Sequence, residues 1–270
     1  MKPFVAAAVL VGSTLIGAQQ QTSNPRSGWP CGARLDTSYF QVAEGSGGHL
    51  LLLAPEEIGD SATLLTALGS HRQTIFRAAG SVRSGVHEFQ VPIDPSVESV
   101  IFAISAQCLG VAHVLRPSGL PASGDDVTDL SNFRAQRMVI VARPEPGIWT
   151  IRVSGSGVSG VMVQARSAIG ISQVQFALSG STTSKPVPTV GVEHVVRMQI
   201  SGKFTEIRAS LVSGEFRRIS DLPLEAGDTE GSYVSRFTPG TQGFRVLIAG
   251  KDAAGVVFQR LHAPLLSAVR

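Results

Sequence analysis

The stretch "SGSGVSG", residues 154–160, has the glycine spacing of a phosphate-binding loop. Gly155, Gly157 and Gly160 satisfy G-x-G-x-x-G, a pattern that holds a pyrophosphate where a strand enters the loop and a helix leaves it. The residues that follow, "VMVQARS", alternate apolar and polar side chains as a β-strand does. We therefore interpret the glycines as a hairpin loop that supplies positive φ angles, and we predict no cofactor site here.

The densest group of acids lies in "SGDDVTD" and contains Asp125, Asp126 and Asp129. Clustered carboxylates in a loop suit Ca²⁺, but their spacing does not match an EF-hand, and loop acids also serve simple solvation. These three residues are weak calcium candidates, and no metal site is predicted.

The remaining side chains give no catalytic pattern. The histidines have no His-x-x-x-His pair, no G-x-S-x-G elbow is present, and nothing distinguishes one pair of acids from another. We therefore expect no enzyme activity. The histidines are His49, His71, His87, His113, His194 and His262.

The elements around these residues are mostly short strands separated by turn residues. In "IWTIRVS", Trp149, Ile151 and Val153 share one face, which predicts that they lie in a first core, with Gly147 shaping the turn before them. A second core is predicted to contain Phe237, Phe244, Val246 and Phe258. The expected fold is mainly β, with two antiparallel β-sandwich (Ig-like) domains preceded by a small α/β segment.

Composition changes along the chain divide it into six parts. Residues 1–18 have a positive start and an apolar run too short to span a bilayer, which predicts a signal peptide, an uncleaved anchor being the alternative. An extended leader follows at 19–35, then the α/β segment at 36–80, and the first sandwich at 81–180. A linker at 181–191 precedes the second sandwich at 192–270.

Both cysteines, Cys31 and Cys108, remain after the signal peptide is removed. In an oxidising compartment an even number of cysteines favours a disulfide, although the apolar surroundings of Cys108 also suit a buried free thiol. The net charge of +3 is spread along the chain without a basic run, so nucleic acid is not an expected partner. No later stretch is long and apolar enough to insert into a membrane, so the mature chain is expected to be secreted, to the extracellular space or a periplasm.

Several segments, taken in order, resemble one extracellular family. "VPIDPSVESVIFAIS", "PSG" at 117–119, "PEPGIWTIRVSGSG" and "VMVQARSAIGI" are similar to the segment that follows the von Willebrand factor A domain in hemicentins. "AEGSGGHLLLL" resembles the end of an A domain, and "GKDAAGVVFQR" matches a G-x-D-x-x-G-x-x-F-Q-R pattern found further along in that family. The resemblance covers about residues 36–262.

The resemblance implies an adhesion or matrix-type protein that is not an enzyme. It does not transfer the metal site of the A domain, because "DTSYF" at 36–40 lacks the second serine of Asp-x-Ser-x-Ser. The expected partner is an extracellular protein or a glycan. Two alternatives stay open. An accessory or hydrolytic enzyme of the cell exterior would need a pocket with paired acids or a Ser–His pair. A structural spacer is favoured if neither sandwich exposes a large apolar patch.

Overall fold

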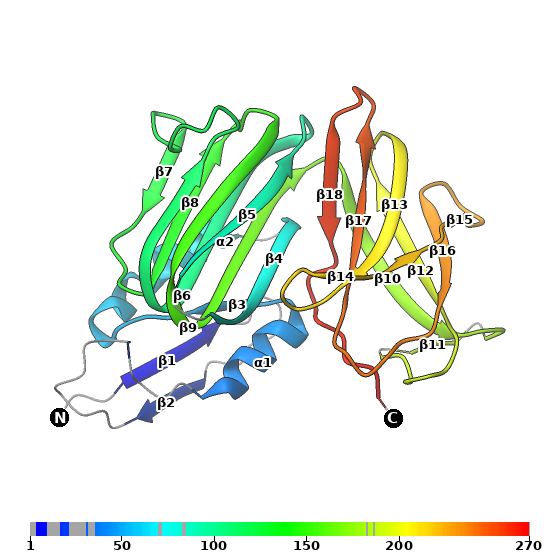
Figure 1. Ribbon diagram of the computed structural model, residues 1–270, viewed down its shortest axis with the longest axis horizontal. Coiled ribbons are helices and arrows are strands. Elements are labelled where there is room, and N and C mark those ends of the chain that lie inside the picture. Colours follow the sequence, from blue (N-terminus) through cyan, green and yellow to red (C-terminus); the bar gives the residue numbers. More distant parts are fainter. Residues whose placement is uncertain are drawn as a thin grey trace.

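The chain folds into three packed parts, shown in Figure 1. The structure, a computed structural model, describes residues 4–9, 17–21, 31, 36–69, 72–82, 85–181, 183–185 and 187–269. An α/β segment lies beneath a first β-sandwich, and a second β-sandwich stands beside both (Figure 1). The predicted fold class, mainly β with antiparallel sheets, is confirmed. Apart from residues 19–21 and Cys31, the expected leader at 19–35 lies outside the described residues.

The α/β segment contains a small sheet in the order β2-β1-β3 and two helices. Part of the expected signal peptide pairs in this sheet, since β1 is antiparallel to β3. The helix α1 starts where the Asp36 side chain accepts a hydrogen bond from Ser38 N at 2.9 Å, and it ends at Gly47. The elements are β1 (Phe4–Val9), β2 (Gly17–Gln21), α1 (Thr37–Ser46), β3 (His49–Leu51), the 3₁₀ helix η1 (Pro55–Asp60) and α2 (Ser61–Leu68).

This segment covers the outer face of the first sandwich. Leu64 and Leu68 of α2 pack with Ile101 and Met138, which point outward from the sandwich sheet. The sheet is therefore buried on both faces at this point, which explains the continuous apolar runs in "SVIFAIS" and "RMVIVA".

The first sandwich is a single six-stranded sheet folded onto itself. Its order is β4-β9-β6-β8-β7, and β5 also pairs with β9. The strands are β4 (Gln73–Val82), β5 (Val86–Ile93), β6 (Val97–Leu115), β7 (Val127–Leu130), β8 (Gln136–Ala142) and β9 (Gly147–Ser167). The two longest strands, β6 and β9, run through both layers and pair along most of their length.

The register of these two strands shows where the sheet bends. The first half of β9 pairs with β5 and its second half with β4, while the β6–β9 register breaks between Ala106 and Cys108 and again between Leu109 and Ala112. Phe102 and Trp149 come from opposite halves, yet their rings stack at 5.3 Å. The two halves of one sheet therefore face each other across a common core.

The hairpin predicted at the glycines is wrong, because β9 continues through them. Gly155 is paired with Leu109 at the bend, and a Cβ on it would stand 2.4 Å from the carbonyl oxygen of the neighbouring Cys108. Gly157 has φ +84°, and its Cβ would meet the side chain of Gln107. The glycines thus supply conformational freedom as expected, but they bend a pair of strands and do not reverse the chain.

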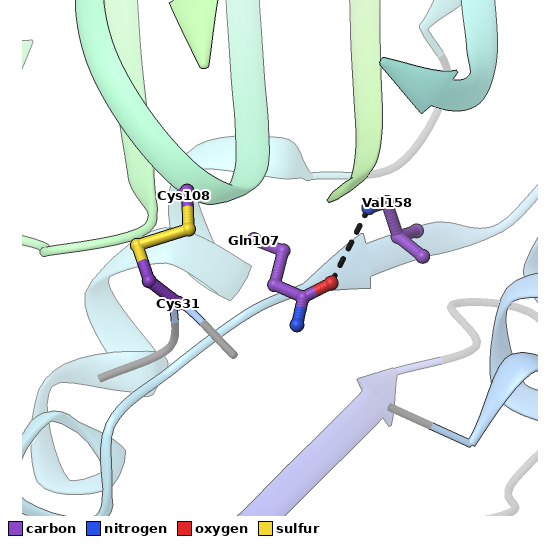
Figure 2. Close-up of a disulfide and its surroundings, with 4 residues drawn as sticks. All are labelled: Cys31, Gln107, Cys108 and Val158. Atoms are coloured by element: carbon purple, nitrogen blue, oxygen red, sulfur yellow. Dashed lines mark hydrogen bonds between the residues drawn. A yellow bond between two sulfur atoms is a disulfide. The ribbon is translucent and has the colours of Figure 1, made fainter. Parts of the chain in front are cut away.

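The bend also carries the disulfide between Cys31 and Cys108, which Figure 2 shows. This is the first of the two alternatives left open by the sequence. Beside it, Val158 N donates to the side-chain carbonyl of Gln107 at 3.5 Å. The disulfide closes a loop with a sequence separation of 77. In the loop-entropy treatment, a cross-link of this length raises the free energy of unfolding by about 4 kcal/mol.

Trp149, Ile151 and Val153 lie in the first core together with Val161 and Val163 from the other half of β9. Trp149 is fully buried, and its indole N–H donates to the Glu145 carbonyl at 3.0 Å. Burial with a satisfied donor gives this residue a structural role.

The second sandwich has the strand arrangement of an immunoglobulin-like domain. One sheet has the order β11-β10-β12-β16-β15 and the other β14-β13-β17-β18. The strands are β10 (Gly170–Leu178), β11 (Ser184–Lys185), β12 (His194–Ser201), β13 (Phe204–Val212), β14 (Arg218–Leu222), β15 (Glu225–Ala226), β16 (Ser232–Phe237), β17 (Arg245–Asp252) and β18 (Val257–Leu261). Phe237, Phe244, Val246 and Phe258 pack between the two sheets.

Two of the boundaries drawn from the sequence need correction. Strand β4 begins at Gln73 and pairs with β9, so the first sandwich starts before residue 81. Strand β10 precedes the predicted linker yet pairs with β12, so the second sandwich starts at Gly170. The alternation of a strand does not reveal which sheet it joins, so the sequence alone places the boundary at the Pro-containing segment 181–191, which lies within the second sandwich.

A buried ion cluster joins all three parts. Glu44 of α1 accepts hydrogen bonds from Arg77 of β4, at 2.8 Å from Nε to Oε1, and an ion pair connects its other oxygen to Arg245 of β17. Arg245 also donates from Nε to the Ala263 carbonyl at 2.9 Å and from Nη1 to the Gly214 carbonyl at 3.2 Å. One carboxylate thus holds one cation from each sandwich.

A second buried pair lies between the two sandwiches. Arg260 of β18 and Asp94, which follows β5, are both fully buried, with 2.8 Å between Nη1 and Oδ2. Arg260 Nε also donates to the Ile169 carbonyl at 2.8 Å. Because a buried charge without its partner is costly, these contacts restrict the relative position of the sandwiches.

The bend predicts a sharp difference between two glycines of the same strand. Gly155→Ala should lower the free energy of unfolding by about 2 kcal/mol, because its methyl group would overlap the Cys108 backbone. Gly160→Ala is the matched control, since its nearest neighbour would be the Ser105 hydroxyl at 3.7 Å. Denaturant unfolding of both variants measures the difference, and equal losses would contradict the role assigned to the bend.

The cluster also predicts acid sensitivity through two histidines. Burial, together with the charge of Arg77 for His49 and of Arg245 for His262, lowers the pKa of each imidazole from its ordinary value of 6.5 to about 4. As the pH falls, the imidazoles of the unfolded chain bind protons near pH 6.5, whereas those of the folded chain do so only near pH 4. The folded state therefore keeps its full stability above pH 6.5 and loses part of it as the pH falls toward 4. At pH 5 the loss should reach about 2 kcal/mol for each histidine.

This prediction is tested with the double variant His49→Gln, His262→Gln, which cannot titrate at these positions. Its free energy of unfolding should change less between pH 7 and pH 5 than that of the unmodified chain. Parallel curves for the two proteins would show that neither histidine contributes.

Candidate functional site

A groove of about 450 Å³ opens where the two sandwiches meet. It lies at the edge of the first sandwich, between the end of β4, the start of β5 and the bend of β9, and the β13–β14 hairpin of the second sandwich forms its opposite wall. In Figure 1 this hairpin projects from the second sandwich toward β4. The volume is within the range of sites that hold a small molecule or a few residues of a partner.

The floor of the groove consists of side chains that belong to the first core. Ala78, Val153 and Val161 are each less than 9% exposed, and Phe89 is partly buried against the same cluster. Ala78 and Val161 are directly paired across β4 and β9. The floor is therefore apolar and held rigidly by the sheet.

The walls carry the polar groups. Glu215 and Arg217 of the hairpin form an ion pair at 2.8 Å, with side chains 55% and 81% exposed. His87 and Ser159 line the first-sandwich side, where the Ser159 hydroxyl donates to the Gly80 carbonyl at 3.5 Å. An ion pair this exposed adds little stability, so its side chains can contact an incoming group.

Phe216, between the two charged residues, fixes the hairpin in place. Its ring lies 4.4 Å from that of Phe76, and it packs against the first core. Ala79 N donates to the Gly214 carbonyl at 3.0 Å, which joins the hairpin to β4. Phe216 has φ +63°, an uncommon conformation for a bulky residue, which the surrounding contacts maintain.

These groups can bind, but they do not form a glycosidase arrangement. Such an enzyme needs two carboxylates across the cleft, and the one that lines this groove, Glu215, is paired with Arg217. The groove instead offers an apolar floor with a carboxylate, a guanidinium and an imidazole around it. This chemistry suits reversible contact.

The weak calcium candidates do not come together. Asp126 pairs with Arg116 at 2.8 Å and Asp129 with Arg137 at 2.5 Å, so two of the three carboxylates have their own cations. Within the described ranges, no group of three or more His, Cys, Asp or Glu side chains could hold a metal ion.

Of the residues singled out from the sequence, Val153 and His87 reach the groove, whereas Trp149 and Ile151 lie inside the first core. Sequence reasoning missed Glu215 and Arg217, because charged residues in a hairpin normally indicate only an exposed turn. Among the helices described, none is long and apolar enough to cross a bilayer.

Comparison with known proteins connects this architecture to one family. Residues 74–168, the first sandwich, match the family described as hemicentin galactose-binding domain-like. Mouse Hemicentin-1 is 24% identical over 244 residues, which are 86% of this chain and 4% of that protein. Mouse Hemicentin-2 is 25% identical over 260 residues, which are 88% of this chain and 5% of that protein.

Among solved structures, the Bacillus licheniformis lipase BlEst2 in its propeptide form matches with a TM-score of 0.33 and 12% identity, over 72% of this chain and 40% of that one. A similarity of this size carries no argument about fold or function. The hemicentin matches have consistent coverage, and the first sandwich lies within all of them. The chain is therefore hemicentin-like over most of its length, and it spans about one twentieth of the length of these relatives.

Proposed function

We propose that the mature chain is a secreted, non-catalytic protein of the adhesion or matrix type, which binds through the surfaces of its two β-sandwiches. The observation that carries the proposal is the groove at their junction, on a chain that is similar to hemicentins over 86% of its length. Removal of residues 1–18 on export is part of the proposal; it takes β1 from the small sheet but none of the residues that line the groove. The disulfide between Cys31 and Cys108 suits an oxidising compartment outside the cytosol.

The rigid frame supports a binding role. Glu44 holds Arg77 and Arg245 in one buried cluster, and Arg260 pairs with Asp94 across the same junction. A site held in this way loses little conformational entropy when a partner binds. The groove is therefore formed before the partner arrives.

Both alternatives are less well supported by the groove. A hydrolase of the cell exterior needs a second catalytic group beside Glu215, and this carboxylate is ion-paired with Arg217. A pure spacer has no need to leave core residues such as Val153 and Val161 accessible in a groove between its domains. We take an extracellular protein or a glycan as the partner at this level of the proposal.

We further propose that the α/β segment before β4, residues 36–69, corresponds to the end of a von Willebrand factor A domain without its metal site. A strand, β3, is followed by a helix, α2, and both pack on a neighbouring sheet. Asp36, the first residue of the partial metal motif, uses its carboxylate to cap α1. Binding should therefore be independent of divalent metal.

The proposal predicts saturable, metal-independent binding. The secreted chain, incubated with extracellular matrix from cultured cells, should bind equally with and without a chelator, because no group of acidic, His or Cys side chains in the described part of the chain could hold a metal ion. Unlabelled chain should compete, and chain that has been reduced, alkylated and denatured should not. Loss of binding in chelator would reinstate a metal role, and an absence of saturable binding would refute the proposed function.

A further inference from the structure

We propose that the groove is an anchor site for an apolar side chain, leucine-like or phenylalanine-like, on an exposed loop of an extracellular protein partner. This inference rests on the proposed binding function and specifies its partner. It is carried by the composition of the floor, by the chain's own use of the adjacent surface, and by the charges around the opening.

The floor of the groove is apolar and consists of core side chains. Ala78, Val153 and Val161 belong to the core, and the groove leaves them within reach of an incoming group. Small and β-branched residues leave space that a longer side chain can fill. Transfer of such a side chain from water onto this floor is favourable in proportion to the apolar area that it buries.

The neighbouring interface shows what this edge of the sandwich accepts. There the hairpin inserts Phe216 against Phe76, and its Gly214 carbonyl accepts one backbone hydrogen bond from Ala79 of β4. At this edge, one aromatic anchor and one backbone hydrogen bond therefore attach the hairpin to the first sandwich. The groove continues this interface, because Glu215 and Arg217 on either side of Phe216 form its wall.

The rim has the groups that a peptide backbone needs. Glu215 accepts hydrogen bonds, Arg217 donates them, and both side chains are more than half exposed. An apolar centre with a polar rim is the usual composition of the strongest contacts in protein interfaces. The rim can thus bond the amide groups on either side of the anchor.

A glycan fits this groove less well than a side chain does. Sugar sites pair hydroxyl groups with polar side chains along the floor and stack the ring on an open aromatic face. Here the floor is aliphatic, and the aromatic ring that lines the groove, Phe89, packs 5.4 Å from Phe76 and against the core. A volume of about 450 Å³ holds a leucine or phenylalanine residue with its adjoining amides.

The experiment is an NMR titration of the ¹⁵N-labelled full mature chain. N-acetyl-phenylalaninamide and N-acetyl-leucinamide are the probes, and N-acetyl-alaninamide and galactose are the comparison compounds. The two apolar probes should shift the backbone amides of Ala79, Gly80, His87 and Phe89, which border the groove. Alaninamide and galactose should leave them unchanged at equal concentration.

Two variants locate the binding. Ser81→Trp, at an exposed position on the rim, should reduce these shifts by about fivefold or more. Its matched control, Ser118→Trp, is also exposed but does not line the groove and should behave as the unmodified chain. Ala78→Leu fills the floor from within and should have the same effect as Ser81→Trp, provided that its spectrum remains that of a folded protein.

Shifts caused by galactose but not by the apolar amides would overturn the inference, as would no shift with any probe. Matrix capture separates this failure from that of the proposed function. If Ser81→Trp abolishes capture and Ser118→Trp does not, the anchor site is supported. If both variants bind matrix as well as the unmodified chain, the groove is not the contact surface, while the proposed binding function stands.

Discussion

The first sandwich depends on one constraint: β6 and β9 must bend at the same place. The bend turns one sheet into two facing layers, and it permits Phe102 of one half to stack on Trp149 of the other. It is possible because Gly155 allows the Cys108 carbonyl to approach where any Cβ would overlap it. The disulfide to Cys31 attaches at the same point. Core, cross-link and groove therefore all depend on two strands that remain paired while they change direction.

The buried ion pairs at the junctions fix the relative positions of the three parts more than they raise the free energy of unfolding. Taking Glu44, Arg77 and Arg245 out of water costs several kcal/mol for each ion, which their attraction and hydrogen bonds offset only when the geometry is satisfied. The cluster is complete when α1, β4 and β17 are all in place. It therefore excludes other arrangements of the three parts, because each of them would leave a guanidinium buried without its carboxylate. We infer that this selectivity keeps the groove in a single shape.

The local alternation of side chains in the sequence predicted strands and core residues. Which strands pair with each other depends on segments that are far apart in the sequence. The alternation of Trp149, Ile151 and Val153 indicates an inward face wherever the strand lies. A hairpin and a bent strand both place glycine between two alternating runs. Only the continuous pairing of β9 with β6 distinguishes the two, and the residues around Gly155 do not reveal this pairing. Arg260 did carry a signal, since it has the same alternation phase as Phe258 and thus points inward. A charge in phase with a core predicts a buried partner, but not that the partner is Asp94.

The groove belongs to neither sandwich alone. Its floor comes from β4, β5 and β9, which lie within the segment similar to the hemicentin galactose-binding domain-like family, residues 74–168. Its opposite wall comes from the β13–β14 hairpin, more than forty residues beyond that segment. Without the hairpin, Phe76 would lose the ring of Phe216 and Ala79 would lose the Gly214 carbonyl. The first sandwich would then expose a longer apolar edge with an unpaired N–H, the kind of surface that associates non-specifically. The second sandwich thus both protects this edge and limits it to an opening of defined size, which is where we propose that a partner side chain binds.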